Sequence, residues 1–147
     1  MLKQPNSAQC FACGLENTYG LNLTFYSDGP DKVVCNPVIP DHYQGYPGVV
    51  HGGIVASMLD EIVVRVFMSA DPNRFMYTAK LTTRFRHPVP TVKRLQLIGT
   101  IIKDRGRRAE SKAELFGPDG TLLADAKALV VALPEEVMQS TSLDQLG

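Results

Sequence analysis

The residues best suited to chemistry are His51-Gly52-Gly53 and, further along the same apolar stretch, Asp60. The two glycines have no Cβ, so a substrate carbonyl can approach their backbone closely. If a helix begins here, its first amides are unpaired and lie at the positive end of the helix dipole, where they can stabilise an oxyanion. We expect Asp60 to be a buried carboxylate that acts as a base or nucleophile. The alternatives are a structural Asp60–arginine pair and glycines that only ease a turn.

Two further polar residues, and His51 itself, have more than one possible role. Glu61 is the adjacent carboxylate and the second choice for the catalytic acid, but on a helix it points about 100° away from Asp60. It can also pair with Arg65 one turn later. Ser57 lies one turn before both acids and could orient a carboxylate, or simply be a small residue in a packed helix. His51 could serve as an acid or base, bond a substrate oxygen, shape the loop or cap the helix.

The elements that must position these residues can be predicted from periodicity. Residues 54–68 are apolar almost all round, which indicates a helix buried on most sides, and Pro72 ends it. The remaining segments alternate apolar and polar residues as strands do, at 21–25, 32–38, 78–86, 95–103, 108–116 and 121–133. The sequence therefore predicts an α+β fold, with an antiparallel sheet wrapped around one long central helix. Open sheet edges favour side-by-side dimerisation.

Length and composition restrict the class of protein. The 147 residues suit a single domain, 1–147, with an N-terminal segment at 1–19 and a flexible tail at 134–147. Lys plus Arg and Asp plus Glu both number 15, so no nucleic-acid partner is indicated. No apolar run reaches the length of a membrane span, so we expect no membrane partner. Three cysteines argue against a disulfide framework, and a cytoplasmic location is the simplest inference.

Two groups of residues could bind an ion or an anionic ligand: a pair of cysteines and a run of basic residues. Cys10 and Cys13 have metal-like spacing, but there is no second pair and no nearby histidine, so we expect no metal and no cofactor. Between Lys80 and Lys112 there are ten basic residues and only two acidic ones. This cationic window is either the solvated face of a sheet or holds an anionic ligand such as nucleotide phosphates.

The segment 49–61, VVHGGIVASMLDE, resembles the signature of hotdog-fold thioesterases, in particular the phenylacetyl-CoA thioesterase-like (PaaI-type) branch. Other stretches resemble the same family, so the similarity spans about residues 10–133. They are Cys10-Phe11-Ala12-Cys13-Gly14 with Gly20-Leu21, Gln44-Gly45-Tyr46-Pro47-Gly48-Val49-Val50, and Arg84-Phe85 with Pro88-Val89. The helix motif is specific in its context, whereas each short stretch alone is weak.

The resemblance implies hydrolysis of an acyl-CoA thioester to a free acid and CoA, with Asp60 as base or nucleophile. It implies the amide of Gly52 as oxyanion donor, with Gly53 beside it. It further implies a homodimer or homotetramer in which Thr83 and His87 reach the neighbouring subunit's site.

For the CoA nucleotide, the resemblance indicates cations near the start of a late strand, and we select Arg105, Arg107 and Arg108. Two alternatives keep the fold. One is a non-catalytic acyl-CoA-binding module. The other is a hotdog dehydratase or hydratase in which His51 is the catalytic histidine.

Overall fold

The computed structural model describes residues 1–140, with the backbone alone at 138–140. The strands are β1 (Leu2–Lys3), β2 (Tyr26–Ser27), β3 (Lys32–Cys35), β4 (Met76–Phe85), β5 (Gln96–Asp104), β6 (Arg108–Phe116) and β7 (Leu122–Ala132). The helices are α1 (Gly52–Arg65) and α2 (Glu135–Ser140), with 3-10 turns η1 (Asp41–Tyr43) and η2 (Val66–Met68).

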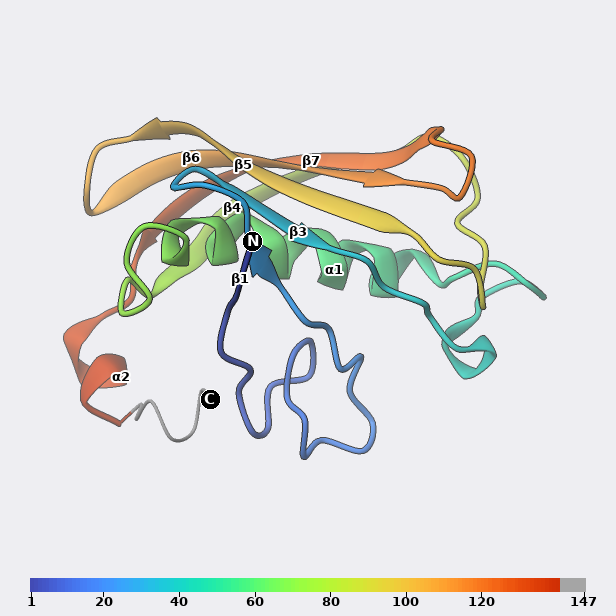
Figure 1. Cartoon of the computed structure of the whole chain (residues 1–147), viewed down its shortest axis with the longest axis horizontal. Coiled ribbons are helices and arrows are strands. Elements are labelled where there is room, and N and C mark those ends of the chain that lie inside the picture. The colour runs from blue at the N-terminus through green and yellow to red at the C-terminus, as the bar shows by residue number, and fades with distance from the viewer. Residues whose placement is uncertain (141–147) are drawn as a thin grey trace.

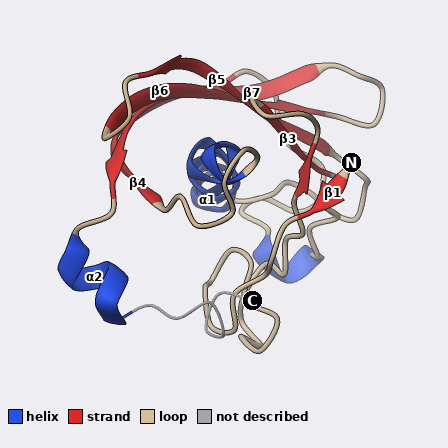
Figure 2. Ribbon diagram, turned by 60° about the vertical axis from the view of Figure 1, so that its left-hand side comes forward, coloured by secondary structure: helices blue, strands red, loops and turns tan. Residues whose placement is uncertain are grey.

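The strands form one antiparallel sheet in the order β1-β2-β3-β5-β6-β7-β4. The sheet curves around α1, which lies along its concave face (Figures 1 and 2). The predicted α+β architecture, a sheet wrapped around one long central helix, is therefore confirmed. The two ends of the sheet are β1, of two residues, and β4, of ten.

The core forms where α1 meets the sheet. One stripe of the helix is buried completely or nearly so, and it consists of Val55, Met58, Leu59, Ile62 and Val63. This stripe faces alternate residues of the long strands, as the period of two in a strand requires. Many of those strand residues are small, and they include Ala113, Ala124, Ala126 and Ala128. Small side chains on the sheet let the helix backbone lie close to it.

The helix comes close to the sheet at Gly99 in β5. A Cβ built on Gly99 would lie 3.0 Å from the Ile62 carbonyl oxygen and 3.0 Å from Val33 Cγ1. Nearby, the buried hydroxyl of Ser111 donates to the Val63 carbonyl oxygen at 2.7 Å. A glycine and a serine therefore fix how deeply the C-terminal half of α1 lies against the sheet.

Two predicted strands differ from those observed. Leu21, Leu23 and Phe25 are buried alternately, but they form no strand, because Leu21 N and Leu23 N donate to Phe11 and Ala12 in the N-terminal segment. Only Tyr26–Ser27 joins the sheet. The strand predicted at 32–38 ends at Cys35, shortly before Pro37, which has no N–H to donate to a sheet.

The C-terminal segment was predicted to be a flexible tail from residue 134. Glu135–Ser140 form α2, and residues 141–147 lie outside the described part of the chain. No helix among the described residues is both long and apolar enough to span a membrane.

We predict that Gly99→Ala lowers the free energy of unfolding by about 1–3 kcal/mol, because the added methyl group meets backbone and two side chains of a closed core. Urea unfolding measures this. The matched control is Gly45→Ala, whose added Cβ meets its nearest atom at an ordinary 3.4 Å and should change stability by less than about 0.5 kcal/mol. Equal stability of both variants would show that the helix is not seated as closely as described.

Candidate active site

Asp60 lies on α1 but is exposed, so the prediction of a buried carboxylate is wrong for the single chain. The reason is its position on the helix. Leu59 and Ile62 face the sheet, whereas Asp60 lies on the side that the sheet leaves uncovered. Among the described residues, no hydrogen bond or ion pair engages its carboxylate. The alternative, a pair between Asp60 and an arginine, is therefore not observed there. Asp60 is therefore a free acid on an open helix face.

The N-terminus of α1 is capped by the side chain of His51. Its Nδ1 accepts a hydrogen bond from Gly53 N at 2.9 Å. The amide of Gly53 is therefore engaged and not free for a substrate oxygen. Because Nδ1 is an acceptor, the neutral imidazole carries its proton on Nε2, which leaves that N–H as a donor on an exposed ring.

Gly52 presents the free amide at this helix end. Its N–H has no hydrogen-bond partner among the described residues, and a Cβ here would meet only Phe85 Cε1, at 3.8 Å. Neither Gly52 nor Gly53 has a positive φ. The backbone therefore does not require glycine at Gly52. At Gly53 a Cβ would lie 3.1 Å from His51 Nδ1, so a structural reason for that glycine is present in the helix cap.

Gly52 and Asp60 are separated along the helix. Eight residues at 1.5 Å each place them about 12 Å apart along the axis. Ser57, between them, donates its hydroxyl to the Gly53 carbonyl oxygen at 2.8 Å and so does not orient either carboxylate. Within one chain the two principal candidates share a helix but do not converge on one point.

Thr83 and His87 lie along and just beyond β4. Thr83 is half-buried opposite Ala126 of β7, and His87 is exposed, with its backbone N–H donating to Leu123. Phe85, between them, is 54% exposed and approaches Gly52. The end of this edge strand therefore lies beside the start of α1.

The three predicted cations lie at and just beyond the β5–β6 turn, and all are exposed. Arg105 and Arg108 line a hollow of about 310 Å³, whereas Arg107 does not. The turn lies near the C-terminal end of α1, away from Gly52 (Figure 1). Arg74 fixes it there, because its guanidinium binds both oxygens of Asp104 at 2.6 and 2.7 Å.

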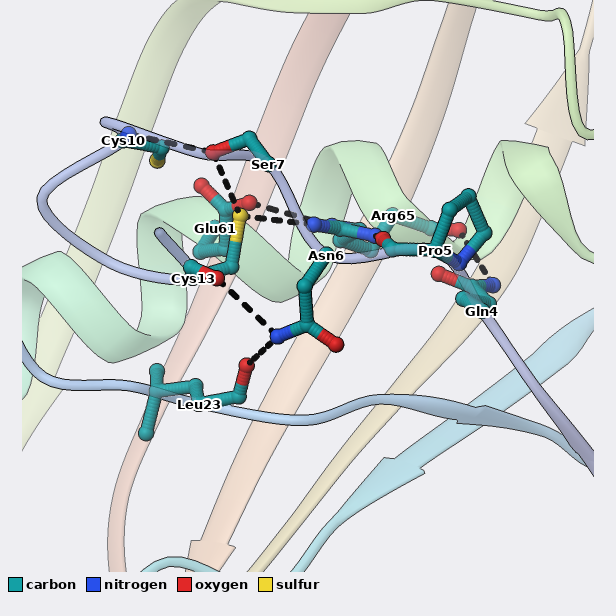
Figure 3. A network of polar contacts seen from close by, with 9 residues as sticks. All are labelled: Gln4, Pro5, Asn6, Ser7, Cys10, Cys13, Leu23, Glu61 and Arg65. Carbon is teal, nitrogen blue, oxygen red and sulfur yellow. Dashed lines mark hydrogen bonds and ion pairs between the residues drawn. The ribbon is translucent and has the colours of Figure 1, made fainter. Parts of the chain in front are cut away.

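Glu61 points away from Asp60, into a polar network beneath the N-terminal segment (Figure 3). Its carboxylate accepts from Arg65 Nε at 3.1 Å, which confirms the predicted pair. Burial raises the pKa of Glu61 to about 7, although the positive charge of Arg65 opposes this. The same guanidinium donates to the Pro5 carbonyl oxygen at 2.6 Å.

Cys13 belongs to this network, and sequence reasoning did not anticipate the group. Its sulfur accepts from Arg65 Nη2 at 2.7 Å, and it lies 3.5 Å from Ser7 Oγ. A hydrogen bond from Cys10 and the charge of Arg65 lower the pKa of Cys13 to about 4, while the same hydrogen bond raises the pKa of Cys10. The spacing of the two cysteines was visible in the sequence, but their proximity to an acid 48 residues later was not.

Comparisons with known proteins place the chain in a family. The family model for the thioesterase superfamily matches residues 47–124. Acyl-coenzyme A thioesterase THEM4 from Rattus norvegicus is 29% identical over 133 residues, which cover 89% of this chain and 56% of the rat protein. The chain thus spans little more than half the length of that relative.

Solved structures share the fold. Protein RHA08564, a thioesterase superfamily protein, aligns with a TM-score of 0.74 and 28% identity over 83% of this chain and 59% of that one. The PaaI protein of the E. coli phenylacetic acid degradation operon aligns with a TM-score of 0.69 and 14% identity, over 78% of this chain and 81% of PaaI.

The PaaI alignment agrees, at the level of the fold, with the PaaI-type resemblance of the helix motif. The fold is the hotdog fold. Since the family match covers the loop before α1, the helix itself and the strands up to the start of β7, this chain belongs to the thioesterase superfamily.

Proposed function

We propose that this protein hydrolyses acyl-CoA thioesters, with Asp60 as base or nucleophile and the Gly52 amide as oxyanion donor. The observation that carries the proposal is that a carboxylate and a helix-terminal amide, neither with a partner among residues 1–140, are both exposed on α1. Family membership and a relative named as an acyl-coenzyme A thioesterase support this choice of substrate.

The chemistry requires only these groups and water. Asp60 either removes a proton from the attacking water or attacks the carbonyl carbon itself. In the second route the acyl group is first joined to Asp60 as a mixed anhydride, which water then hydrolyses. In either case the C–S bond breaks, the sulfur leaves as CoA thiolate and takes up a proton, and the acyl group ends as the free acid. The Gly52 amide, with the outward Nε2–H of His51 as a second donor, stabilises the negative charge on the carbonyl oxygen.

The spacing on α1 implies that one site uses two chains. An attacking group lies about 3–3.5 Å from the carbonyl carbon, and an oxyanion donor lies about 3 Å from the carbonyl oxygen. With the carbonyl bond between them, the attacking group and the donor are therefore at most roughly 7 Å apart. The two groups are about 12 Å apart along the helix of one chain. We therefore assign Gly52 from one subunit and Asp60 from its partner to each site of a homodimer.

The edge strand β4 supports such a dimer. It has ten residues, pairs only with β7 among the described strands, and ends beside Gly52. A long unpaired edge is suited to pairing with a second copy. In that assembly Thr83 and His87 lie next to the shared boundary, where they can contact the partner's substrate. We further propose that the hollow lined by Arg105 and Arg108 binds phosphates of the CoA nucleotide.

The first prediction concerns Asp60→Asn, which keeps the shape of the side chain and removes its charge. We expect kcat to fall by about 10²–10⁴ while Tm stays unchanged, because an exposed side chain contributes little to stability. Release of free thiol from a panel of acyl-CoAs measures the rate. Asp31→Asn, another exposed acid, is the control and should keep wild-type turnover. Saturable acyl-CoA binding without thiol release by the wild type would instead identify a binding module.

The second prediction concerns Gly52→Ala. The added methyl meets no close neighbour and favours the helix, so we expect an equal or higher Tm. It also crowds the amide that receives the substrate oxygen, so kcat/KM should fall by at least about tenfold. Steady-state kinetics with thermal unfolding of the same sample tests both. An unchanged kcat/KM would remove Gly52 from the oxyanion site.

The third prediction tests the shared site. Asp60→Asn and Gly52→Val chains, each inactive alone, are co-expressed so that they form mixed dimers. With equal expression, about half of the dimers are mixed. In each mixed dimer, one of the two sites has both native groups and the other has neither. About a quarter of wild-type activity should therefore return. If both groups acted within one chain, every site would carry a defect and no activity would return.

A further inference from the structure

The turn at Cys10–Cys13 brings two thiols to one point. Gly14 N donates to the Cys10 carbonyl oxygen at 2.7 Å, and Cys10 N donates to Ser7 Oγ at 3.0 Å. The backbone of this turn is so tight that a Cβ built on Gly14 would lie 2.5 Å from the Cys10 carbonyl oxygen. Glycine at this position is thus a steric requirement of the turn, and the turn directs both sulfurs towards α1 (Figure 3).

A third donor reaches the same point from α1. The two sulfurs and a carboxylate oxygen of Glu61 all lie within 4.8 Å of one another. Around a tetrahedral zinc ion, Zn–S distances of about 2.3 Å and Zn–O distances of about 2.0–2.2 Å place neighbouring ligand atoms roughly 3.6–3.8 Å apart. The three groups therefore reach a coordination geometry after small side-chain movements, with the backbone unchanged.

Arg65 occupies the position of an outer partner to such a site. Its guanidinium donates to Cys13 Sγ at 2.7 Å and to Glu61 Oε1 at 3.1 Å, so it orients two of the three donor groups. Hydrogen bonds of this kind to ligand atoms typically fix metal ligands. The charges also balance. Two thiolates and a carboxylate carry three negative charges, which one divalent cation and one guanidinium neutralise in a place where a net charge is costly.

An adjoining cavity supplies access. It has a volume of about 260 Å³, and its lining includes Cys10, Cys13, Glu61 and Arg65. Cys10 is only half-buried, so solvent reaches the donor group from this side. A fourth ligand, water, can therefore complete a tetrahedral set.

We propose that Cys10, Cys13 and Glu61 bind a thiophilic divalent cation of the zinc class, with Arg65 as outer partner and water as fourth ligand. On binding, the cation replaces whatever protons the two sulfurs and the carboxyl group still hold, and these protons pass to solvent. The ion ties the N-terminal segment to α1 at the residue next to Asp60, on another face of the helix. The site does not involve Gly52 or Asp60, so the test of metal binding is independent of the test of the proposed hydrolase activity.

The test is titration of the 147-residue chain with Co²⁺ after reduction with a non-chelating phosphine. We expect one Co²⁺ per chain, with thiolate-to-cobalt charge-transfer absorption in the near ultraviolet, tetrahedral d–d bands in the visible, and displacement by Zn²⁺. Bound metal should also raise Tm, because it binds only the folded chain. Cys35→Ala, which removes the third thiol, in β3, should titrate as wild type.

Variants at the ligands give the decisive comparison. Cys10→Ser and Cys13→Ser should lose the charge-transfer band while keeping the far-ultraviolet circular dichroism of the fold. Glu61→Gln keeps both thiols, so it should retain the band with affinity lowered by at least about tenfold. Three results would overturn the proposal: no cobalt–thiolate absorption in the wild type, equal affinity in Cys13→Ser, or a Cys10–Cys13 disulfide whose reduced form takes up no cobalt.

Discussion

The packing of α1 against the concave face of the sheet is the constraint on which the rest of the molecule depends. Gly99 has no side chain where the helix lies close to β5, and Ser111 donates to a carbonyl oxygen of the helix. Together they fix the helix in depth and rotation. Once Met58 and Ile62 are buried, the direction of every other side chain on α1 is determined by the 100° step between residues.

That rotation separates the polar residues of the helix into different environments. Asp60 lies on the uncovered side, whereas Glu61, one residue later, turns beneath the N-terminal segment and meets Arg65. Adjacent carboxylates thus have different chemistry. One is unpaired and faces solvent, where a second subunit and a substrate can reach it. The other is enclosed by a guanidinium and two thiols, which suits holding a cation.

The N-terminal segment has a structural role that its short β1 strand does not reveal. It covers the part of α1 around Glu61 and Arg65, where Arg65 donates to the Pro5 carbonyl oxygen. Asn6 holds the segment itself together by donating to the Cys13 and Leu23 carbonyl oxygens. A bound metal would add one more connection between this segment and the helix. The proposed hydrolytic site uses Gly52 at the start of the helix and Asp60 on another face of it, so the two sites can coexist on one element.

The sequence by itself determined the class of fold, the presence of the central helix, four of the strands and the Glu61–Arg65 pair, because these follow from local periodicity and spacing. It also identified Asp60 and Gly52 as candidates, through their residue types and a family resemblance. Only the tertiary structure decided that Asp60 is exposed, that Gly53 is engaged by His51, and that Leu21–Phe25 bind the N-terminal segment without forming a strand. It alone brought Cys10, Cys13 and Glu61 together. The physical reason is that burial and contact depend on which face of a helix the rest of the chain covers, and local patterns do not contain that information.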